Sequence, residues 1–203
     1  MGRRNDHSPE MLREMMINAA REIVVSDGVS ALSARRVTDR VGYSVGSLYQ
    51  AFANLDDLIA HLNQQTLLDM HLTMDAALRR GKRNGMPVLK RLGRAYAQFA
   101  RDNPVLWRLA FEHRMPKGQS PPKATVMQGE ALIQLVIEPL AAVTGLSGRN
   151  LETVAQVLWS GIHGICILTV TSRMQFVGRT ALPTLTDSLI ENYLAGVTAN
   201  KAA

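Results

Sequence analysis

The stretch that decides the fold of this chain spans residues 33–52 and reads SARRVTDRVGYSVGSLYQAF. Two short helices are predicted in it, at 33–41 and 45–52, and the N-cap residues are Ser33 for the first and Ser44 for the second. Gly42 lies between them and permits a sharp turn in which a side chain would be strained. The pattern is that of a helix-turn-helix. The apolar positions that we expect to face inward are Val37, Val41, Leu48 and Phe52.

The outward face of the second helix carries side chains that are small or end in hydrogen-bonding groups. A helix fits the major groove of duplex DNA, where such groups can read base edges. The hydroxyl of Ser44 and the free amides of the first turn can hold a phosphate. The alternative is a structural three-helix unit without a DNA role, in which these exposed positions would have no purpose. The outward residues are Val45, Gly46, Ser47, Tyr49 and Gln50.

Most of the remaining sequence also places apolar residues three or four positions apart, which indicates helices. Cap residues and Gly or Pro breaks divide the chain into about nine helices. We therefore predict an all-α fold, with a DNA-binding domain at 1–54 and a helical effector-binding and dimerisation domain at 55–203. The predicted helices are 8–27, 33–41, 45–52, 54–80, 88–102, 104–114, 123–144, 150–174 and 183–198.

The composition limits the class of protein and its location. With 46% hydrophobic and 20% charged residues, the chain can form a sizeable core. No run reaches the ~18 apolar residues of a membrane span, and the polar N-terminus lacks a signal-peptide core, so we expect a cytoplasmic protein with no membrane partner. The net charge of +6 suits an anionic partner, but residues 1–57 hold seven arginines and eight acids. Charge alone therefore does not identify the DNA-reading segment.

The sequence contains none of the residue combinations typical of an active site. A Gly-x-Ser-x-Gly elbow and a phosphate-binding glycine loop are missing, and acids are sparse beyond residue 58. The single cysteine, Cys166, lies in an apolar run and is predicted to be a buried, inert thiol. We expect no catalytic residue, no cofactor and no metal. A non-enzymatic helical adaptor for other proteins is the alternative, and it would bind duplex DNA only non-specifically.

Residues 28–58 resemble the DNA-binding domain of the TetR family of transcriptional regulators. The matching features are Ala19-Ala20, Asp27-Gly28, the run VGYSVGSLY at 41–49 with Phe52, and DDL at 56–58. The resemblance implies a phosphate contact for Ser33 and a place near the groove for Arg35. It further implies that Ser44, Tyr49 and Gln50 hold the DNA backbone and that Val45, Gly46 and Ser47 meet the bases.

The chain departs from the family pattern at three positions that affect DNA binding. The family often has Lys or Arg where this chain has Val45, Lys where it has Leu55, and His or Tyr where it has Gln50. The loss of two cations weakens the salt-dependent part of binding. Arg3 and Arg4, on an N-terminal arm, are expected to compensate in the minor groove.

The C-terminal part resembles the effector-binding region of the same family. Residues 103–111 look like the short helix beneath many effector pockets, and Trp159, His163 and Gly164 resemble the Trp-His-Gly signature of one subgroup. The pocket should be apolar, although most of its candidates, His163 included, would also suit a plain core. The candidate pocket residues are Met70, Met74, Phe99, Trp107, Phe111, Met127, Trp159 and His163.

A basic run at 79–83, with Lys90, Arg91 and Arg94, leaves the charge of the effector open. Such cations suit a helix C-terminus and a solvated face, and the alternative is an anionic effector such as an acyl thioester of coenzyme A. The favoured interpretation is the solvated face, and with it a small, largely apolar effector.

Two apolar stripes near the C-terminus predict a homodimer with a four-helix interface. The alternative is that both stripes are buried within one subunit. A dimer suits a near-palindromic DNA operator, because two recognition helices then meet two half-sites. By the resemblance, the protein is a repressor that the effector releases. The candidate interface residues are Val154, Leu158, Gly161, Ile165, Leu185, Leu189 and Tyr193.

Overall fold

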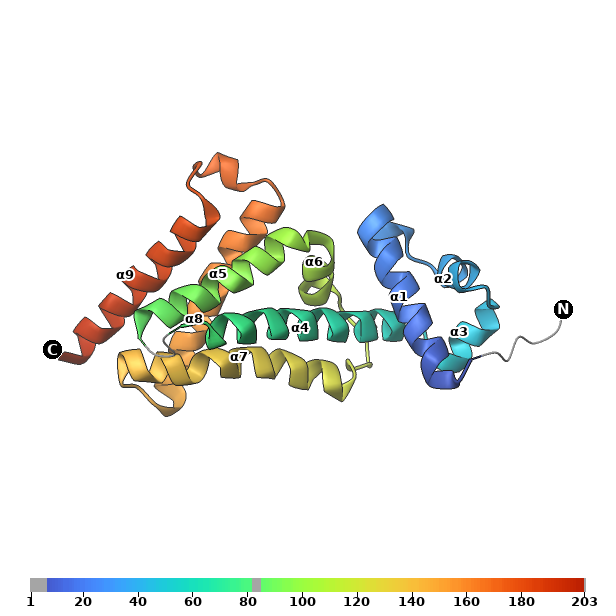
Figure 1. Cartoon of the computed structure of the whole chain (residues 1–203), viewed down its shortest axis with the longest axis horizontal. Coiled ribbons are helices and arrows are strands. Elements are labelled where there is room, and N and C mark those ends of the chain that lie inside the picture. The colour runs from blue at the N-terminus through green and yellow to red at the C-terminus, as the bar shows by residue number, and fades with distance from the viewer. Residues whose placement is uncertain (1–6, 82–84, 203) are drawn as a thin grey trace. The chain divides into compact units, whose positions relative to one another are not determined.

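The computed structural model describes residues 7–81 and 85–202, and within these ranges it contains α-helices and short 3-10 helices but no strand (Figure 1). The all-α prediction is confirmed. Arg3 and Arg4 of the predicted arm, and Lys82 and Arg83 of the basic run, lie outside the described residues. The elements are α1 (Pro9–Asp27), η1 (Val29–Ala31), α2 (Ala34–Val41), α3 (Val45–Ala51), α4 (Leu55–Arg79), α5 (Met86–Asp102), α6 (Pro104–Glu112), α7 (Lys123–Thr144), α8 (Gly148–Val170), η2 (Met174–Phe176) and α9 (Leu182–Ala202).

Helix caps fall where the sequence places them. The hydroxyl groups of Ser8, Ser33 and Ser44 each accept a hydrogen bond from an amide of the first turn, over 3.2–3.3 Å. Asn54 does the same for α4 over 2.8 Å. Gly42 ends α2 with φ 76° and ψ 30°, the left-handed conformation that glycine adopts without strain. These caps explain why the predicted bounds of α2 and α3 agree with the structure.

The end of α8 differs from its prediction, because the helix stops at Val170 rather than at residue 174. The hydroxyl of Thr171 donates to the carbonyl of Ile167 over 2.6 Å, and Ser172 then takes φ 57°. A positive φ at a residue other than glycine leaves no mark in the sequence, so the helical pattern runs on past the true end.

The chain forms two compact units. Unit 1 contains Met1–Leu67 and Val105–Met127, and unit 2 contains Leu68–Pro104 and Gln128–Ala203. Helix α4 therefore contributes residues 55–67 to unit 1 and 68–79 to unit 2. The domain boundary between residues 54 and 55 stays a prediction.

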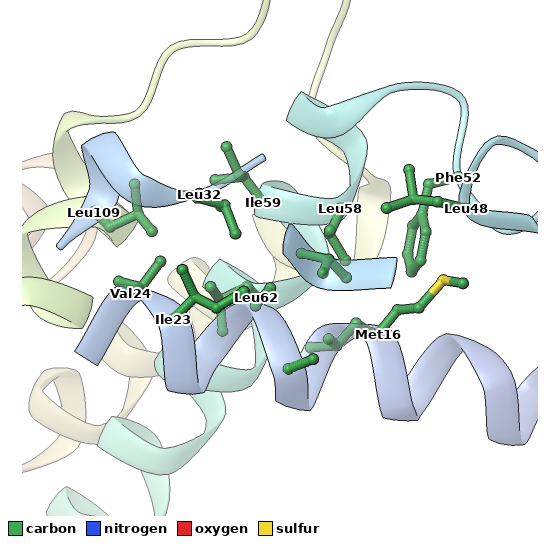
Figure 2. Close-up of a cluster of buried hydrophobic side chains, with 14 of the residues drawn as sticks. Met16, Ile23, Val24, Leu32, Leu48, Phe52, Leu58, Ile59, Leu62 and Leu109 are labelled. Carbon is green, nitrogen blue, oxygen red and sulfur yellow. The ribbon is translucent and has the colours of Figure 1, made fainter. Parts of the chain in front are cut away.

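The core of unit 1 fixes the helix-turn-helix (Figure 2). Leu48 of α3 is fully buried and Phe52 is 2% exposed, and both pack with Met16 of α1 and Leu58 of α4 in one cluster. Val37 is fully buried and Val41 packs against the same cluster, so all four inward positions are confirmed. Burying a side chain of this size is worth about 1.5–3 kcal/mol, and this burial holds two helices that are too short to be stable alone.

Unit 2 packs α5, α8 and α9 against one another. The closest approach occurs at glycines. A Cβ atom on Gly93 of α5 would lie 2.7 Å from Cδ1 of Ile190 and 3.0 Å from Cγ2 of Thr186 on α9. A Cβ atom on Gly161 of α8 would lie 2.7 Å from Leu189. Both glycines thus let helix pairs of this unit come closer than alanine would allow.

Cys166 is fully buried in α8, as predicted, and desolvation raises the pKa of its thiol to about 12. The neutral thiol is therefore favoured in the folded protein. Its contribution to stability is present below the ordinary pKa of 9.0 and is lost as the pH rises above it. We expect no reaction of the folded protein with a disulfide reagent near neutral pH and one thiol per chain after unfolding. Rapid labelling of the folded protein would contradict this burial.

Helices α7 and α8 are both long and apolar enough to cross a membrane by length and composition. This is a weak indication, because core helices of soluble proteins pass the same test. Some of the apolar side chains that make these two helices hydrophobic are exposed, including Val126 and Met127 on α7 and Val157 and Leu168 on α8.

Candidate nucleic-acid interface and apolar cavity

Helix α3 presents an exposed face that contains most of the predicted DNA contacts. Val45 is 37% exposed and Tyr49 54%, while Ser44, Gly46 and Gln50 are also exposed. Ser47 is half-buried, and its hydroxyl lies 3.0 Å from that of Ser44. The Ser44 oxygen accepts from the Ser47 amide. One of the two hydroxyl groups donates to the other, so one hydroxyl proton of the pair is left for an external acceptor such as phosphate. The structure brings these residues together on one short helix.

Gly46 lies in this face without a structural need for glycine. Its φ is not positive, and the nearest atom to a Cβ placed there would be the Ser44 Oγ at 3.7 Å, an ordinary contact. Glycine weakens a helix by about 0.5–1 kcal/mol relative to alanine. A glycine that the fold does not require is consistent with close approach of a ligand to the backbone.

The three arginines of α2 differ in what they contact. Arg36 pairs with Asp27, and Arg40 lies 3.4 Å from Glu22, so both guanidinium groups are engaged within unit 1. The side chain of Arg35 is 86% exposed and its nearest acid, Asp39, is 3.8 Å away. An exposed pair at this distance contributes little to stability. Arg35 is therefore the arginine of α2 with most freedom to meet a phosphate.

Arg13 was not among the predicted site residues, yet it contacts the end of α3. Its guanidinium donates to the carbonyl of Ala51, the last residue of that helix, and its Cζ lies 4.5 Å from the centre of the Phe52 ring. A second nitrogen of the guanidinium lies 2.8 Å from Nε2 of His61 on α4. These contacts join segments 38 and 48 residues apart, which helical spacing alone does not reveal.

An apolar cavity of about 50 Å³ lies inside unit 2. None of its lining side chains is charged, and its polar groups are the indole N–H of Trp159 and the phenol of Tyr96, whose oxygen lies 2.7 Å from Nδ1 of His163. The cavity can therefore hold an uncharged, apolar group. Its lining residues are Met74, Leu89, Leu92, Gly93, Tyr96, Leu132, Ile133, Val136, Ala155, Leu158, Trp159, Ile162 and Ile190.

Two of the predicted pocket residues, Met74 and Trp159, line this cavity. His163 reaches it through Tyr96, and its ring lies 4.8 Å from that of Trp159. The other candidates lie elsewhere. Met70 and Phe99 are buried in unit 2 away from the lining, whereas unit 1 contains the packed pair Trp107–Phe111 and the exposed Met127. Apolar spacing identified inward side chains but not the cluster that each one joins.

The predicted interface residues fall into two groups. Val154 and Leu158 are buried within unit 2, Leu158 lines the cavity, and Gly161 packs on Leu189 of α9. The remaining predicted residues, Ile165, Leu185, Leu189 and Tyr193, are half-buried. One face of α8 is exposed at Thr153, Val157, Ser160, Gly164 and Leu168, and its exposed apolar side chains are Val157 and Leu168.

The basic run is largely neutralised within unit 2. Lys90 pairs with Glu191, Arg94 donates from Nε to Asp187 over 2.8 Å, and both pairs join α5 to α9. On α4, Arg79 donates to Asp75 over 2.7 Å. Arg91 donates from Nε to the carbonyl of Ala77 over 3.3 Å. Three cations of the run, Arg79, Lys90 and Arg94, are thus paired with acids, which favours the solvated-face interpretation over an anionic effector.

Two family models match the chain. The model described as bacterial regulatory proteins, tetR family, matches residues 16–62. The model described as tetracyclin repressor-like, C-terminal domain, matches residues 89–193, just over half of the chain. The first contains the helix-turn-helix and the second contains α8 with the Tyr96–His163 pair. Assignment to the Trp-His-Gly subgroup stays a prediction.

Relatives and solved structures agree with these matches. An uncharacterized HTH-type transcriptional regulator of Mycobacterium tuberculosis is 25% identical over 173 residues, covering 85% of this chain and 77% of that protein. A protein of unknown function from Rhodococcus sp. RHA1 superposes with a TM-score of 0.77 at 19% identity, covering 96% and 98% of the two chains. A candidate transcriptional regulator from Pseudomonas aeruginosa PAO1 gives a TM-score of 0.72 at 18% identity, covering 96% and 93%. At these identities the two structures show the fold alone.

Proposed function

The chain belongs to the TetR family of bacterial regulatory proteins and is a DNA-binding transcriptional regulator, and from this we propose that it is a cytoplasmic repressor released from its operator by a small, uncharged effector. The observation that carries the proposal is the exposed face of α3, which a buried core holds in place. Ser33, Arg35, Ser44, Tyr49 and Gln50 would hold phosphates and backbone. Val45, Gly46 and Ser47 would meet base edges.

The experiment that tests operator binding is fluorescence anisotropy with duplexes tiling the DNA beside the gene, at one fixed salt concentration. Specific recognition predicts one near-palindromic tile that resists scrambled competitor. Binding that every competitor removes equally would contradict an operator in this region. If a pool of random duplexes then also failed to yield an enriched sequence, the adaptor alternative would be favoured.

Replacing Gly46 by alanine should separate folding from DNA binding. The added methyl group meets only Ser44 Oγ at 3.7 Å, so we expect the free energy of unfolding to rise by up to about 1 kcal/mol. We expect affinity for the operator to fall by about tenfold, because the methyl group occupies the surface that meets the bases. Unfolding by urea and anisotropy measure the two effects. Unchanged operator affinity would remove Gly46 from the interface.

The apolar cavity supports an uncharged effector. Among its lining residues Tyr96 offers the hydroxyl group that a ligand could share, and no charge is available to balance an anion. Met74 places α4 in the cavity wall, and α4 also supplies Leu58 to the core beneath the helix-turn-helix. A ligand that displaces α4 would thereby change the operator-bound state, with a coupling of about 1–3 kcal/mol.

A matched pair of fluorescent probes tests the charge of the effector. N-phenyl-1-naphthylamine is uncharged, and its 8-sulfonate has the same rings with a negative charge. Either probe is larger than the 50 Å³ cavity and enters only if a lining helix such as α4 moves, which is the displacement proposed for the effector. We expect the uncharged probe to bind more tightly and to lower operator affinity, because the cavity lining cannot solvate a sulfonate. Tighter binding of the sulfonate, with release of the operator, would contradict the proposal that the effector is uncharged.

Homodimer formation is typical of the family and is proposed for this chain. Val157, Gly164 and Leu168 form an exposed stripe on α8 at spacings of seven and four residues, suited to helix packing. We propose that this stripe and the half-buried Ile165, Leu185, Leu189 and Tyr193 contribute to the interface. Sedimentation equilibrium should give a dimer, and Val157→Glu should weaken it. A monomer at the concentrations that bind the operator would contradict the proposal.

A further inference from the structure

We propose that Arg13 is a positioning residue that fixes the end of recognition helix α3 to α4, and that it does so only while His61 is neutral. The inference rests on the proposed function, because its consequence is operator affinity. It is carried by the geometry of one cluster in unit 1, in which a single guanidinium contacts the Ala51 carbonyl, the Phe52 ring and His61 Nε2.

The end of α3 needs such a partner. Helix α3 has seven residues, and the last carbonyl groups of a helix have no amide partner within it. A guanidinium at this end satisfies a free carbonyl and interacts favourably with the helix dipole. Stacking over Phe52, which is itself buried in the unit 1 core, fixes the position of the guanidinium. Arg13 therefore orients the helix whose outer face meets DNA.

The contact to His61 depends on protonation. A guanidinium nitrogen can only donate, so Nε2 must be an acceptor and the proton of a neutral ring must lie on Nδ1. Protonation would place a second N–H and a second positive charge against Arg13. Burial, followed by the charge of Arg13, lowers the pKa of His61 below its ordinary value of 6.5, in agreement with a neutral ring at neutral pH.

Other hydrogen-bonding and charged partners lie close to both Arg13 and His61, and they can replace the Arg13–His61 hydrogen bond when it breaks. On α4, Asp57 Oδ1 lies 3.6 Å from His61 Nε2 and would accept from the protonated ring, and Gln64 also favours the protonated form. On α1, Glu10 and Glu14 line the same open hollow as Arg13 and His61 and could take up a displaced guanidinium. The uncharged Phe52 ring, 5.7 Å from that of His61, packs on the remaining side.

The sign of the pH effect follows from the lowered pKa. The neutral form of His61 is favoured in the folded protein, so its contribution to stability is present above pH 6.5 and is lost as the pH falls below that value. The same protonation releases Arg13 from α4. We therefore expect operator affinity to fall in acid, in addition to any loss of stability.

The test uses the full chain and a duplex enriched from a random pool by the unsubstituted protein near neutral pH. His61→Gln keeps an uncharged acceptor at every pH, and Arg13→Gln removes the guanidinium. Arg101→Gln removes the same charge from unit 2 and serves as the control. Circular dichroism at each pH verifies that the variants are folded, and Arg13→Lys, which keeps the charge without the fork, replaces Arg13→Gln if that variant does not fold.

Between about pH 7.5 and pH 5.5, we expect the unsubstituted protein to lose about tenfold more affinity than His61→Gln. Arg13→Gln should bind the duplex about tenfold more weakly at neutral pH, and its affinity should depend less on pH. In this variant the amides of α3 should exchange hydrogen faster, while those of α2 should be unchanged. An equal acid loss in His61→Gln, or an Arg13→Gln variant that behaves like Arg101→Gln, would overturn the inference. Failure to enrich any duplex would contradict operator binding instead, and hydrogen exchange would still test Arg13.

Discussion

Val45→Glu should reduce affinity for the selected duplex on the order of 100-fold, whereas Val45→Lys should increase it. Val45 is the first residue of α3 and is 37% exposed on the face proposed to meet DNA. A carboxylate there would meet the phosphates as a like charge, and an ammonium would add one phosphate contact. The slope of log affinity against log salt should steepen by about 0.9 for the lysine variant.

The same pair of variants contains its own control for folding. A negative charge in the first turn of a helix is favourable and a positive charge is unfavourable, each by about 0.3–1 kcal/mol. Stability and DNA affinity should therefore change in opposite directions in both variants. Urea unfolding measures stability, and fluorescence anisotropy at several salt concentrations measures DNA affinity. If affinity followed stability instead, α3 would influence DNA only through folding.

Leu92→Ala should cost about 2–5 kcal/mol of stability. Leu92 is 1% exposed and lines the apolar cavity of unit 2, so truncation removes buried apolar surface and enlarges the 50 Å³ space. An apolar cavity of about 150 Å³ in another protein stays dry and binds benzene. We accordingly expect benzene to raise the melting temperature of Leu92→Ala more than that of the unsubstituted protein.

The matched control is Leu72→Ala, the same truncation in the same unit. Leu72 is 57% exposed on α4, so its loss should change stability by less than about 0.5 kcal/mol. Chemical unfolding at one protein concentration compares the two variants. Equal losses would mean that the cavity wall is not part of the cooperative core.

Much of the fold could be predicted because its signals are local. Serine caps, Gly42 and the apolar spacing around Leu48 identify the helix-turn-helix, and the resemblance adds Arg35, which the structure leaves exposed. Contacts between residues far apart in the sequence could not be predicted from such local patterns. Arg13 resembles any arginine on an amphipathic helix until α3 and α4 pack beside it.

The cavity shows the same limit. Tyr96 and Leu92 lie on α5 with apolar spacing that predicts burial, but spacing does not reveal that Ile162 and Ile190 meet them there. Trp107 and Phe111 have the residue types expected of a ligand site and instead pack on each other in unit 1. Residue type predicted the apolar character of the cavity, and packing alone determined its members.

Unit 1 is built from two separate segments of the chain, and this affects which hybrids between related regulators can fold stably. Leu106 and Leu109 of α6 belong to the same buried cluster as Leu48 and Phe52, although more than fifty residues separate them in the chain. Recombination with a relative at residue 54 would bring together halves of a core that have diverged independently. Hybrids with a new operator specificity should therefore recover stability when the foreign α6 is transplanted together with the foreign N-terminus.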